Sequence, residues 1–293
     1  MSMPLPARLL PALALVFNAF VWGVSWWPFR RLHAAGLHPL VATVLIYLVA
    51  IAAIGLSRPG AWREVARSPA LWVVALASGT TNAAFNWGVT IGDVVRVVLL
   101  FYLMPLWAVL LARLLLGERL TALAGLRVLL ALCGAAIVLW PADGAGFPLP
   151  STLPDWLGVL GGFSFALNNV MLRREAARDG AARALAMFAG GVLVAGAAAA
   201  ALVARGAVAG VPAPALGWML GAALLAAVFL ASNLALQYGA ARLPANATAV
   251  IMITEVVFAA GSALALGGGA LEPRVAGGGA LIMAAALLAA WRR

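Results

Sequence analysis

The sequence contains no lysine, and its nineteen basic residues are all arginine. Acidic residues are rarer still, with nine among 293 residues, so charged side chains make up 10% of the chain against 65% hydrophobic residues. A soluble globular domain carries about 25% charged residues. The chain therefore lacks the polar surface that would coat a soluble core, and its composition predicts an integral membrane protein.

Residues that bind metals or carry out covalent chemistry are also scarce. Cys133 is the only cysteine and lies in an apolar run, where it cannot form an internal disulfide. His33 and His38 are the only histidines, and their neighbourhood lacks the further ligands that a metal site needs. The apolar runs contain no Ser/His/Asp arrangement and no glycine loop for phosphate. We therefore expect neither an enzyme nor an ATPase, and no cofactor or metal.

Long apolar runs recur along the whole chain. Each approaches the ~20 residues that an α-helix needs to cross a bilayer, and all are too continuous for the strands of a barrel. We expect an all-α integral membrane protein with ten transmembrane helices. The runs cover residues 9–29, 39–56, 70–91, 94–116, 124–140, 155–172, 184–204, 215–238, 244–266 and 275–291.

The arginines are distributed unevenly between the two sides of the predicted membrane. With the first segment inside, fourteen arginines fall on inner segments and five on outer segments. Short cytoplasmic loops carry an excess of basic residues, so this distribution predicts that both termini are cytoplasmic. The net charge of +10 then anchors the chain against anionic lipid, and we expect no nucleic-acid partner.

The chain contains two related halves. "NAAFNWG" at 82–88 recurs as "NLALQYG" at 233–239, 151 residues later. "FVWGVSWWPFRRL" at 20–32 is echoed by "FSFALNNVMLRRE" at 163–175, and "LGERLT" at 116–121 by "LGGGALEP" at 266–273. The motifs keep the same order in both halves, which indicates an internal repeat.

A loop rich in proline and glycine divides these halves. We expect a first five-helix repeat over residues 1–141, an inter-repeat loop over 142–154 and a second five-helix repeat over 155–293. Because five is an odd number, the two repeats must cross the membrane in opposite orientations. Inverted repeats are typical of secondary transporters, whose substrate site lies near the midplane between the halves.

Several of these residues resemble a known family. "WGVSW" at 22–26, and Pro105 followed after ten residues by "LGE", resemble the drug/metabolite transporter superfamily, EamA type. Within it, residues 92–113 are most similar to the aromatic amino acid exporters of the YddG type. The resemblance implies a small-molecule exporter of the cell inner membrane. The second half departs from the pattern, because no proline matches Pro105 and "LGE" has become "LGG".

Amide side chains recur at matching positions of the two halves. Asn82 and Asn86 lie one helical turn apart, as do Asn233 and Gln237. Such amides either bind helix to helix or contact a substrate, since an amide both donates and accepts hydrogen bonds. Their recurrence favours a substrate site, and a zwitterion would need both kinds of partner.

Aromatic side chains accompany these amides. Trp22 in the first run corresponds to Phe165 in the sixth, where Asn168 and Asn169 follow. Phe101 and Tyr102 stand near the middle of the fourth run. These residues either pack between helices or line the cavity, where an aromatic face can hold an apolar group or a cation. We place them with the amides in a predicted substrate site.

Glu255 is the one acid placed near the middle of a predicted span. A carboxylate at that depth costs roughly 2.5–3.5 kcal/mol on insertion scales and is usually functional. Its apolar setting favours the protonated form. Glu255 is therefore either a site for a substrate ammonium group or a coupling proton, or a hydrogen-bonded helix fastener, and we include it in the substrate site.

Five residues are candidates for gating or bending. Pro105 removes one backbone donor and frees the carbonyl of Phe101, which should face a neighbour or a wet cavity. Asp93 is placed to cap the fourth helix, and Arg96 can pair with it, extend to the outer surface or form an outer gate with it. Gly161 and Gly162 are candidate flex points.

The sequence thus predicts an exporter of amino acids, neutral or aromatic, that works by alternating access around a central cavity. An exporter of lipophilic cations that uses Glu255 is the alternative. Its expected partners are a small-molecule substrate and the lipid bilayer. The coupling ion stays open, as does the assembly state, and the patterns are compatible with a monomer.

Overall fold

The computed structural model describes residues 5–118, 121–141, 147–240, 242–243 and 245–291. Across these residues every regular element is an α-helix. The helices are α1 (Leu5–Val24), α2 (Trp26–Ala34), α3 (Pro39–Ser57), α4 (Gly60–Arg67), α5 (Pro69–Ile91), α6 (Val94–Phe101), α7 (Met104–Leu116), α8 (Ala122–Leu139), α9 (Leu153–Arg174), α10 (Gly180–Ala204), α11 (Leu216–Ala240), α12 (Ala245–Met252), α13 (Thr254–Leu266) and α14 (Pro273–Trp291).

Six helical segments of the described chain are long and apolar enough to cross a membrane. They are Leu9–Ala34, Pro39–Ser57, Val94–Leu116, Ala122–Leu139, Gly180–Ala204 and Leu216–Ala240. The chain is therefore a multi-pass membrane protein. The long helices α5 and α9 fall outside this set because they carry more polar residues. They pack against each other, and α5 also packs against α10, so both helices lie largely against protein.

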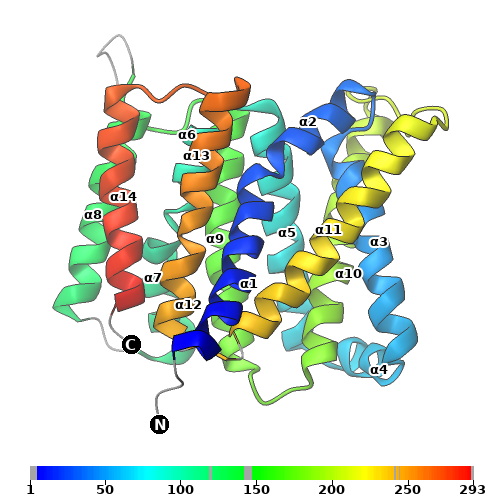
Figure 1. Cartoon of the computed structure of the whole chain (residues 1–293), viewed down its shortest axis with the longest axis horizontal. Coiled ribbons are helices and arrows are strands. Elements are labelled where there is room, and N and C mark those ends of the chain that lie inside the picture. The colour runs from blue at the N-terminus through cyan, green and yellow to red at the C-terminus, as the bar shows by residue number, and fades with distance from the viewer. Residues whose placement is uncertain (1–4, 119–120, 142–146, 241, 244, 292–293) are drawn as a thin grey trace.

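Helices α5 and α9 lie at the centre of the molecule (Figure 1). Helices α8 and α14 pack together on one side, and α3, α10 and α11 lie on the other (Figure 1). Helix α1 crosses between them and contacts α11 and α13. The start of α1 and the end of α14 lie at the same face, which we call the termini face (Figure 1).

Small residues bring the central helices into direct backbone contact. A Cβ atom added at Gly190 of α10 would lie 1.8 Å from the carbonyl oxygen of Ala75 in α5. Gly134 of α8 and Gly278 of α14 pack in the same way: a Cβ atom added at either would lie 2.6 or 2.7 Å from the carbonyl oxygen of the other. Close backbone approach is how helices associate in lipid, where no hydrophobic force joins them. The glycine- and alanine-rich runs thus serve packing.

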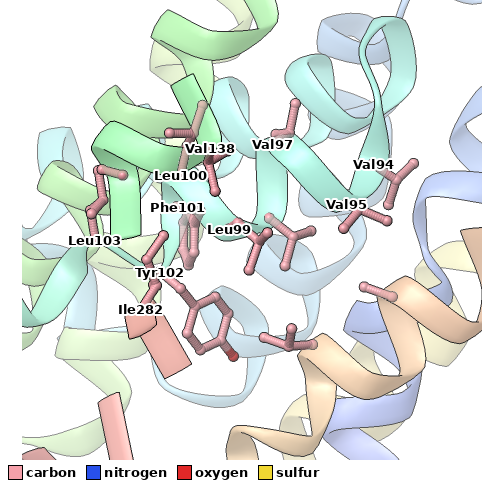
Figure 2. Packing of buried hydrophobic residues seen from close by; sticks show 14 of the residues in the cluster. Val94, Val95, Val97, Leu99, Leu100, Phe101, Tyr102, Leu103, Val138 and Ile282 are labelled. Carbon is pink, nitrogen blue, oxygen red and sulfur yellow. The ribbon is translucent and has the colours of Figure 1, made fainter. Parts of the chain in front are cut away.

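Helix α6 is buried on nearly every face. All of its residues except Arg96 are buried, and they pack against Val138 of α8 and Ile282 of α14 (Figure 2). Tyr102 follows directly after α6 (Figure 2). This packing holds the end of α6 in one place, and the candidate site is built on it.

Three of the expected spans are interrupted rather than continuous. The first bends at Ser25, whose hydroxyl donates to the carbonyl of Trp22 at 2.8 Å. The fourth ends at Phe101 and restarts at Met104, with Pro105 in the first turn of α7, where its missing donor removes no helical bond. The ninth breaks at Ile253 without a proline. Pro105 therefore starts a helix instead of kinking the middle of one.

Candidate functional site

A cavity of about 550 Å³ lies between the two halves of the chain. Its wall takes residues from both halves, and these residues are mostly aromatic or carry an amide or hydroxyl group. The lining includes Asn18, Trp22, Tyr47, Ser78, Asn82, Phe85, Phe101, Tyr102, Phe165, Asn168, Asn169, Phe188, Asn233 and Glu255. Most of the predicted site residues are thus brought together in one place.

The aromatic side chains form a continuous wall of edge contacts. Trp22 of α1 meets Phe85 of α5 with ring centroids 6.1 Å apart. Phe85 in turn meets Phe101 at 5.0 Å, and Phe101 meets Phe165 of α9 at 5.4 Å. Phe85 completes this wall, and sequence reasoning missed it, although it lies inside the repeated "NAAFNWG" motif and next to Asn86. The wall offers ring faces and edges to an apolar or cationic group.

Asn82 holds a second wall residue in place. The hydroxyl of Tyr47 in α3 donates to Oδ1 of Asn82 at 2.5 Å, and Nδ2 of Asn82 donates to the carbonyl oxygen of Ser78 at 2.8 Å. Tyr47 was missed from the sequence, although a lone phenol in an apolar run needs a hydrogen-bond partner once it is buried. Asn82 therefore supports the cavity wall through Tyr47 as well as lining it.

Asn86 does not line the cavity. It is buried, and its Nδ2 donates to Oγ1 of Thr43 in α3 at 2.9 Å. The helix-fastening alternative therefore describes Asn86, which lies on the same side of α5 as Asn82 but one turn further along, where it meets Thr43 instead of the cavity. Asn233 does line the cavity, whereas the side chain of Gln237 lies outside the described residues.

Asn18 is a cavity residue that sequence reasoning missed. It is buried on α1, and its Nδ2 donates to the hydroxyl of Ser232 in α11 at 2.7 Å. An amide inside an apolar run was the available signal. On α9, Asn168 is buried and Asn169 is exposed, and both line the cavity.

Glu255 is the one charged side chain among the described residues that line the cavity. It lies in the first turn of α13, where the helix dipole favours a negative charge. The hydroxyl of Tyr102 lies 3.3 Å from its Oε2 and 3.4 Å from the carbonyl oxygen of Met252. The interruption between α6 and α7 thus meets the one between α12 and α13, and a carboxylate stands where they meet.

The sequence left several contacts open for Arg96, among them pairing with Asp93, and the structure shows a different partner. Arg96 instead binds the buried Asp155 through two hydrogen bonds, Nε to Oδ1 at 2.6 Å and Nη2 to Oδ2 at 3.1 Å. Asp93 caps α6 by accepting from the backbone of Arg96 at 2.9 Å, as expected. Asp155 also forms a capping box with Thr152, and the spacing of these two residues was a signal for it.

Gly161 and Gly162 pack against the end of α6. A Cβ atom added at Gly162 would lie 2.3 Å from the carbonyl oxygen of Phe101, and one added at Gly161 would lie 3.1 Å from the Phe101 ring. The carbonyl of Phe101, at the last residue of α6, therefore faces a neighbour, α9. These glycines are sites of close approach, and their bending stays a prediction.

Metal chemistry gains no support from the described residues, where no group of three or more His, Cys, Asp or Glu side chains could hold an ion. Cys133 is exposed on α8, away from the residues that line the cavity.

Residues 9–140 match the family model of the EamA-like transporter family. A protein of Pseudomonas aeruginosa described as an uncharacterized transporter is 32% identical over 142 residues, which are 46% of this chain. The match spans 48% of that relative, about half of its length. A solved crystal structure of a protein aligns with 95% of this chain and 96% of its own, with a TM-score of 0.57 and 21% identity. That likeness concerns the fold alone.

Proposed function

We propose that this chain is a secondary transporter of the inner membrane that exports small metabolites by alternating access. The observation that carries the proposal is the cavity between the two halves, with its aromatic wall, its amides and its single carboxylate. The match of residues 9–140 to the EamA-like transporter family supports transport. The proposed direction, export, rests on this family resemblance alone.

The proposed architecture is ten spans in two inverted five-helix repeats. The spans would be α1–α2, α3, α5, α6–α7, α8, α9, α10, α11, α12–α13 and α14. Two symmetric features support this arrangement. The fourth span of each repeat is interrupted at the cavity, and the last helices of the two repeats, α8 and α14, pack against each other. Inverted repeats of this kind place the substrate between them.

The proposed substrates are neutral or aromatic amino acids. Glu255 would accept the ammonium group, and Asn168, Asn169 and Asn233 would supply amide contacts to the carboxylate. The rings of Trp22 and Phe165 would hold the apolar side chain. No arginine stands among the described lining residues, so the carboxylate would be bound by neutral donors.

Export of lipophilic cations is the second candidate. The observation that favours it is the same wall, because a carboxylate and aromatic rings without a basic residue form a site for a cation. Phosphorylated and other anionic substrates are disfavoured for the same reason. The role of Glu255 separates the two candidates, because a cation depends on its carboxylate more than a zwitterion does.

Uptake into proteoliposomes tests the proposal. Labelled neutral and aromatic amino acids are supplied with and without a pH gradient to the wild type and to Trp22→Ala and Asn82→Ala. Both substitutions should lower uptake, because one removes part of the aromatic wall and the other releases Tyr47. Leu114→Ala is a matched control, since Leu114 is 77% exposed and distant from the cavity wall. Equal rates in all four proteins would move the site elsewhere.

A further inference from the structure

The two halves are joined directly at the face opposite the termini face, which we call the outer face. The backbone N–H of Val94 donates to the carbonyl of Gly268 at 3.1 Å, and the N–H of Ala270 donates to Oδ2 of Asp93 at 2.9 Å. Residues 93–94 precede or begin α6 in the first half, and residues 268–270 form the turn between α13 and α14 in the second. These two hydrogen bonds, one between backbone groups and one to a side chain, form a short seam that joins the two halves.

The half-buried side chain of Arg30 closes this seam from α2. Its Nε donates to the carbonyl of Thr90 at 3.0 Å, and its Nη2 donates to the carbonyls of Gly92 and Gly268, the latter at 3.2 Å. Its guanidinium also lies 4.8 Å from the ring centre of Trp26. A guanidinium carries five donors in a planar fork, and a cation is favourable at the C-terminal ends of helices such as α5. One side chain thus binds both sides of the seam.

The turn at 268–270 admits only glycine at two positions. A Cβ atom at Gly268 would lie 2.5 Å from the Trp26 ring, and one at Gly269 would lie 2.7 Å from Oδ2 of Asp93. The change from "LGE" in the first half to "LGG" in the second therefore has a structural reason: the glutamate position is occupied by the indole ring that supports Arg30. We name Arg30, Asp93, Val94 and residues 268–270 the outer seam.

The cavity does not reach the outer seam. Its described lining extends to Ala240, the last residue of α11, and to Thr248 in α12, at the termini face (Figure 1). None of the lining residues comes from the seam. The present structure is thus sealed at the outer face by contacts between segments of different halves.

The ion pair between Arg96 and Asp155 lies near the same face, but its role differs from that of the outer seam. They join α6 to α9, and these two helices pack against each other along with α5 and α7. Separating that pair would require taking apart a packed group of helices. The outer seam connects α5 and α6 to α2 and to the turn after α13. Helix α2 packs on α5, and α13 on α6, less extensively than α6 packs on α9.

The repeat supplies a counterpart at the termini face. Arg173 at the end of α9 pairs with Glu118, in the turn between α7 and α8. Arg30 and Arg173 each belong to the double arginine that recurs in the two halves. Each of them contacts the turn before the last helix of the other half. The side chains of Arg173 and Glu118 are exposed, whereas Arg30 is half-buried and binds three carbonyls, so this pair seals its face less than Arg30 does.

We propose that the outer seam is a closed gate and that Arg30 is the residue that latches it. This inference rests on the proposed function, because a gate at the outer face is needed only if the cavity must open there. Opening would release the guanidinium from the carbonyls of Thr90, Gly92 and Gly268, and the helix-pairing contact between Arg96 and Asp155 would stay.

Thiol labelling tests the gate without any substrate. Met104→Cys places a reporter on the cavity wall in a Cys133→Ala background, and a membrane-impermeant maleimide is applied to the outer face. Intact cells present this face if the termini are cytoplasmic, and inverted vesicles present it if they are not. Arg30→Ala should raise the labelling rate about tenfold or more, because each ~1.4 kcal/mol lost by the closed state shifts the equilibrium tenfold.

Two controls make the result decisive. Arg31→Ala removes the neighbouring arginine, which only stacks on Trp27, and should label at the wild-type rate. Gly268→Ala should open the same seam by displacing Trp26, whereas Gly261→Ala, with open space around its Cβ, should not. If neither Arg30→Ala nor Gly268→Ala labels faster than its control in protein that elutes as folded, the gate assignment is wrong. Labelling that rises while amino acid uptake is absent would keep the gate and reject the proposed substrates.

Discussion

At the scale of single residues, Glu255 decides which substrates the cavity can hold. It is the only carboxylate on the described cavity wall, and the hydroxyl of Tyr102 lies within hydrogen-bonding distance of it. An ammonium group that enters the cavity has no other charged partner there. Both candidate functions therefore depend on this residue, but to different degrees.

We expect Glu255→Gln to raise the KM for a transported amino acid at least about tenfold, equivalent to ~1.4 kcal/mol, because the amide cannot form an ion pair with the ammonium group. Efflux of a lipophilic cation should be abolished, since a cation lacks other polar anchors. Initial rates against substrate concentration in proteoliposomes measure the effect. Glu272→Gln, which alters an exposed carboxylate, is the control. An unchanged KM in the Glu255 variant would assign it to helix fastening.

His38 is a residue whose protonation should destabilise the fold. It precedes α3 and caps it, since its Nδ1 accepts from the backbone N–H of Leu40 at 3.3 Å. Burial, together with the nearby His33, lowers the pKa of His38 from 6.5 to about 4. A proton on Nδ1 would remove the acceptor that caps the helix.

The stability of the protein should therefore depend on pH through His38. The unfolded chain binds the proton as the pH falls below 6.5, and the folded protein resists it down to about 4. The contribution of neutral His38 is full above pH 6.5 and decreases as the pH falls toward 4. Melting temperatures in detergent at pH 7.5 and 5 should differ less for His38→Asn, which keeps a cap but cannot titrate. Equal differences in both proteins would contradict this.

At the scale of elements, the interrupted helices depend on glycines that belong to their neighbours. The carbonyl of Phe101, at the end of α6, lies against Gly162 of α9. In the second half, Gly23 of α1 lies against the carbonyl of Glu255, where an added Cβ would be 2.7 Å from the oxygen. Each interruption is thus held by backbone contact with the first span of the opposite half.

We expect Gly162→Ala to destabilise the protein by about 1–3 kcal/mol, because an inserted methyl group would overlap the backbone of Phe101. Gly125→Ala on α8 is the matched control, since its Cβ would meet open space and alanine favours a helix by ~0.5–1 kcal/mol. Unfolding in detergent, followed by tryptophan fluorescence, compares the two. A Gly162 variant as stable as the Gly125 variant would show that α6 and α9 can separate at little cost.

At the scale of the whole molecule, the arrangement of helices bears on topology. The start of α1 and the end of α14 lie at the same face, where α4 and the ion pair between Arg173 and Glu118 are also found (Figure 1). Basic side chains from α4, from the end of α7 and from residues 173–183 gather toward this face. The positive-inside rule then predicts that this face is cytoplasmic.

A reporter fused after residue 293 should consequently be cytoplasmic. A fluorescent protein fused there should fluoresce, and alkaline phosphatase at the same place should be inactive. A second phosphatase inserted after Gly206, in the turn between α10 and α11, should be active, because that turn lies at the outer face. Activity in the reverse pattern would invert the membrane orientation while leaving the cavity in place.

Much of the fold and of the candidate site could be predicted from the sequence. The scarcity of charge and the recurrence of apolar runs determined a helical membrane protein, because no other arrangement satisfies the backbone in lipid. The internal echoes predicted which distant segments would share a site, and Trp22, Phe101, Phe165, Asn82 and Asn233 do line one cavity. Composition and periodicity reflect the environment of a residue, so they predict which segments are buried in lipid or protein.

Tertiary structure alone decided which polar groups face each other. Asn82 and Asn86 are equivalent in sequence, and both bond to residues of α3, one turn apart. Of the two, Asn82 lines the cavity, because it lies at that depth along the helix. Arg96 lies three residues from Asp93 and binds Asp155, 59 residues away, since the packing of α6 on α9 brings that carboxylate within reach. In the sequence, Gly268 and Gly269 are a degraded copy of a motif. In the structure, Trp26 and Asp93 occupy the space that side chains at these two positions would need. Hydrogen bonds and steric exclusion act over a few ångströms in directions that only the folded backbone defines.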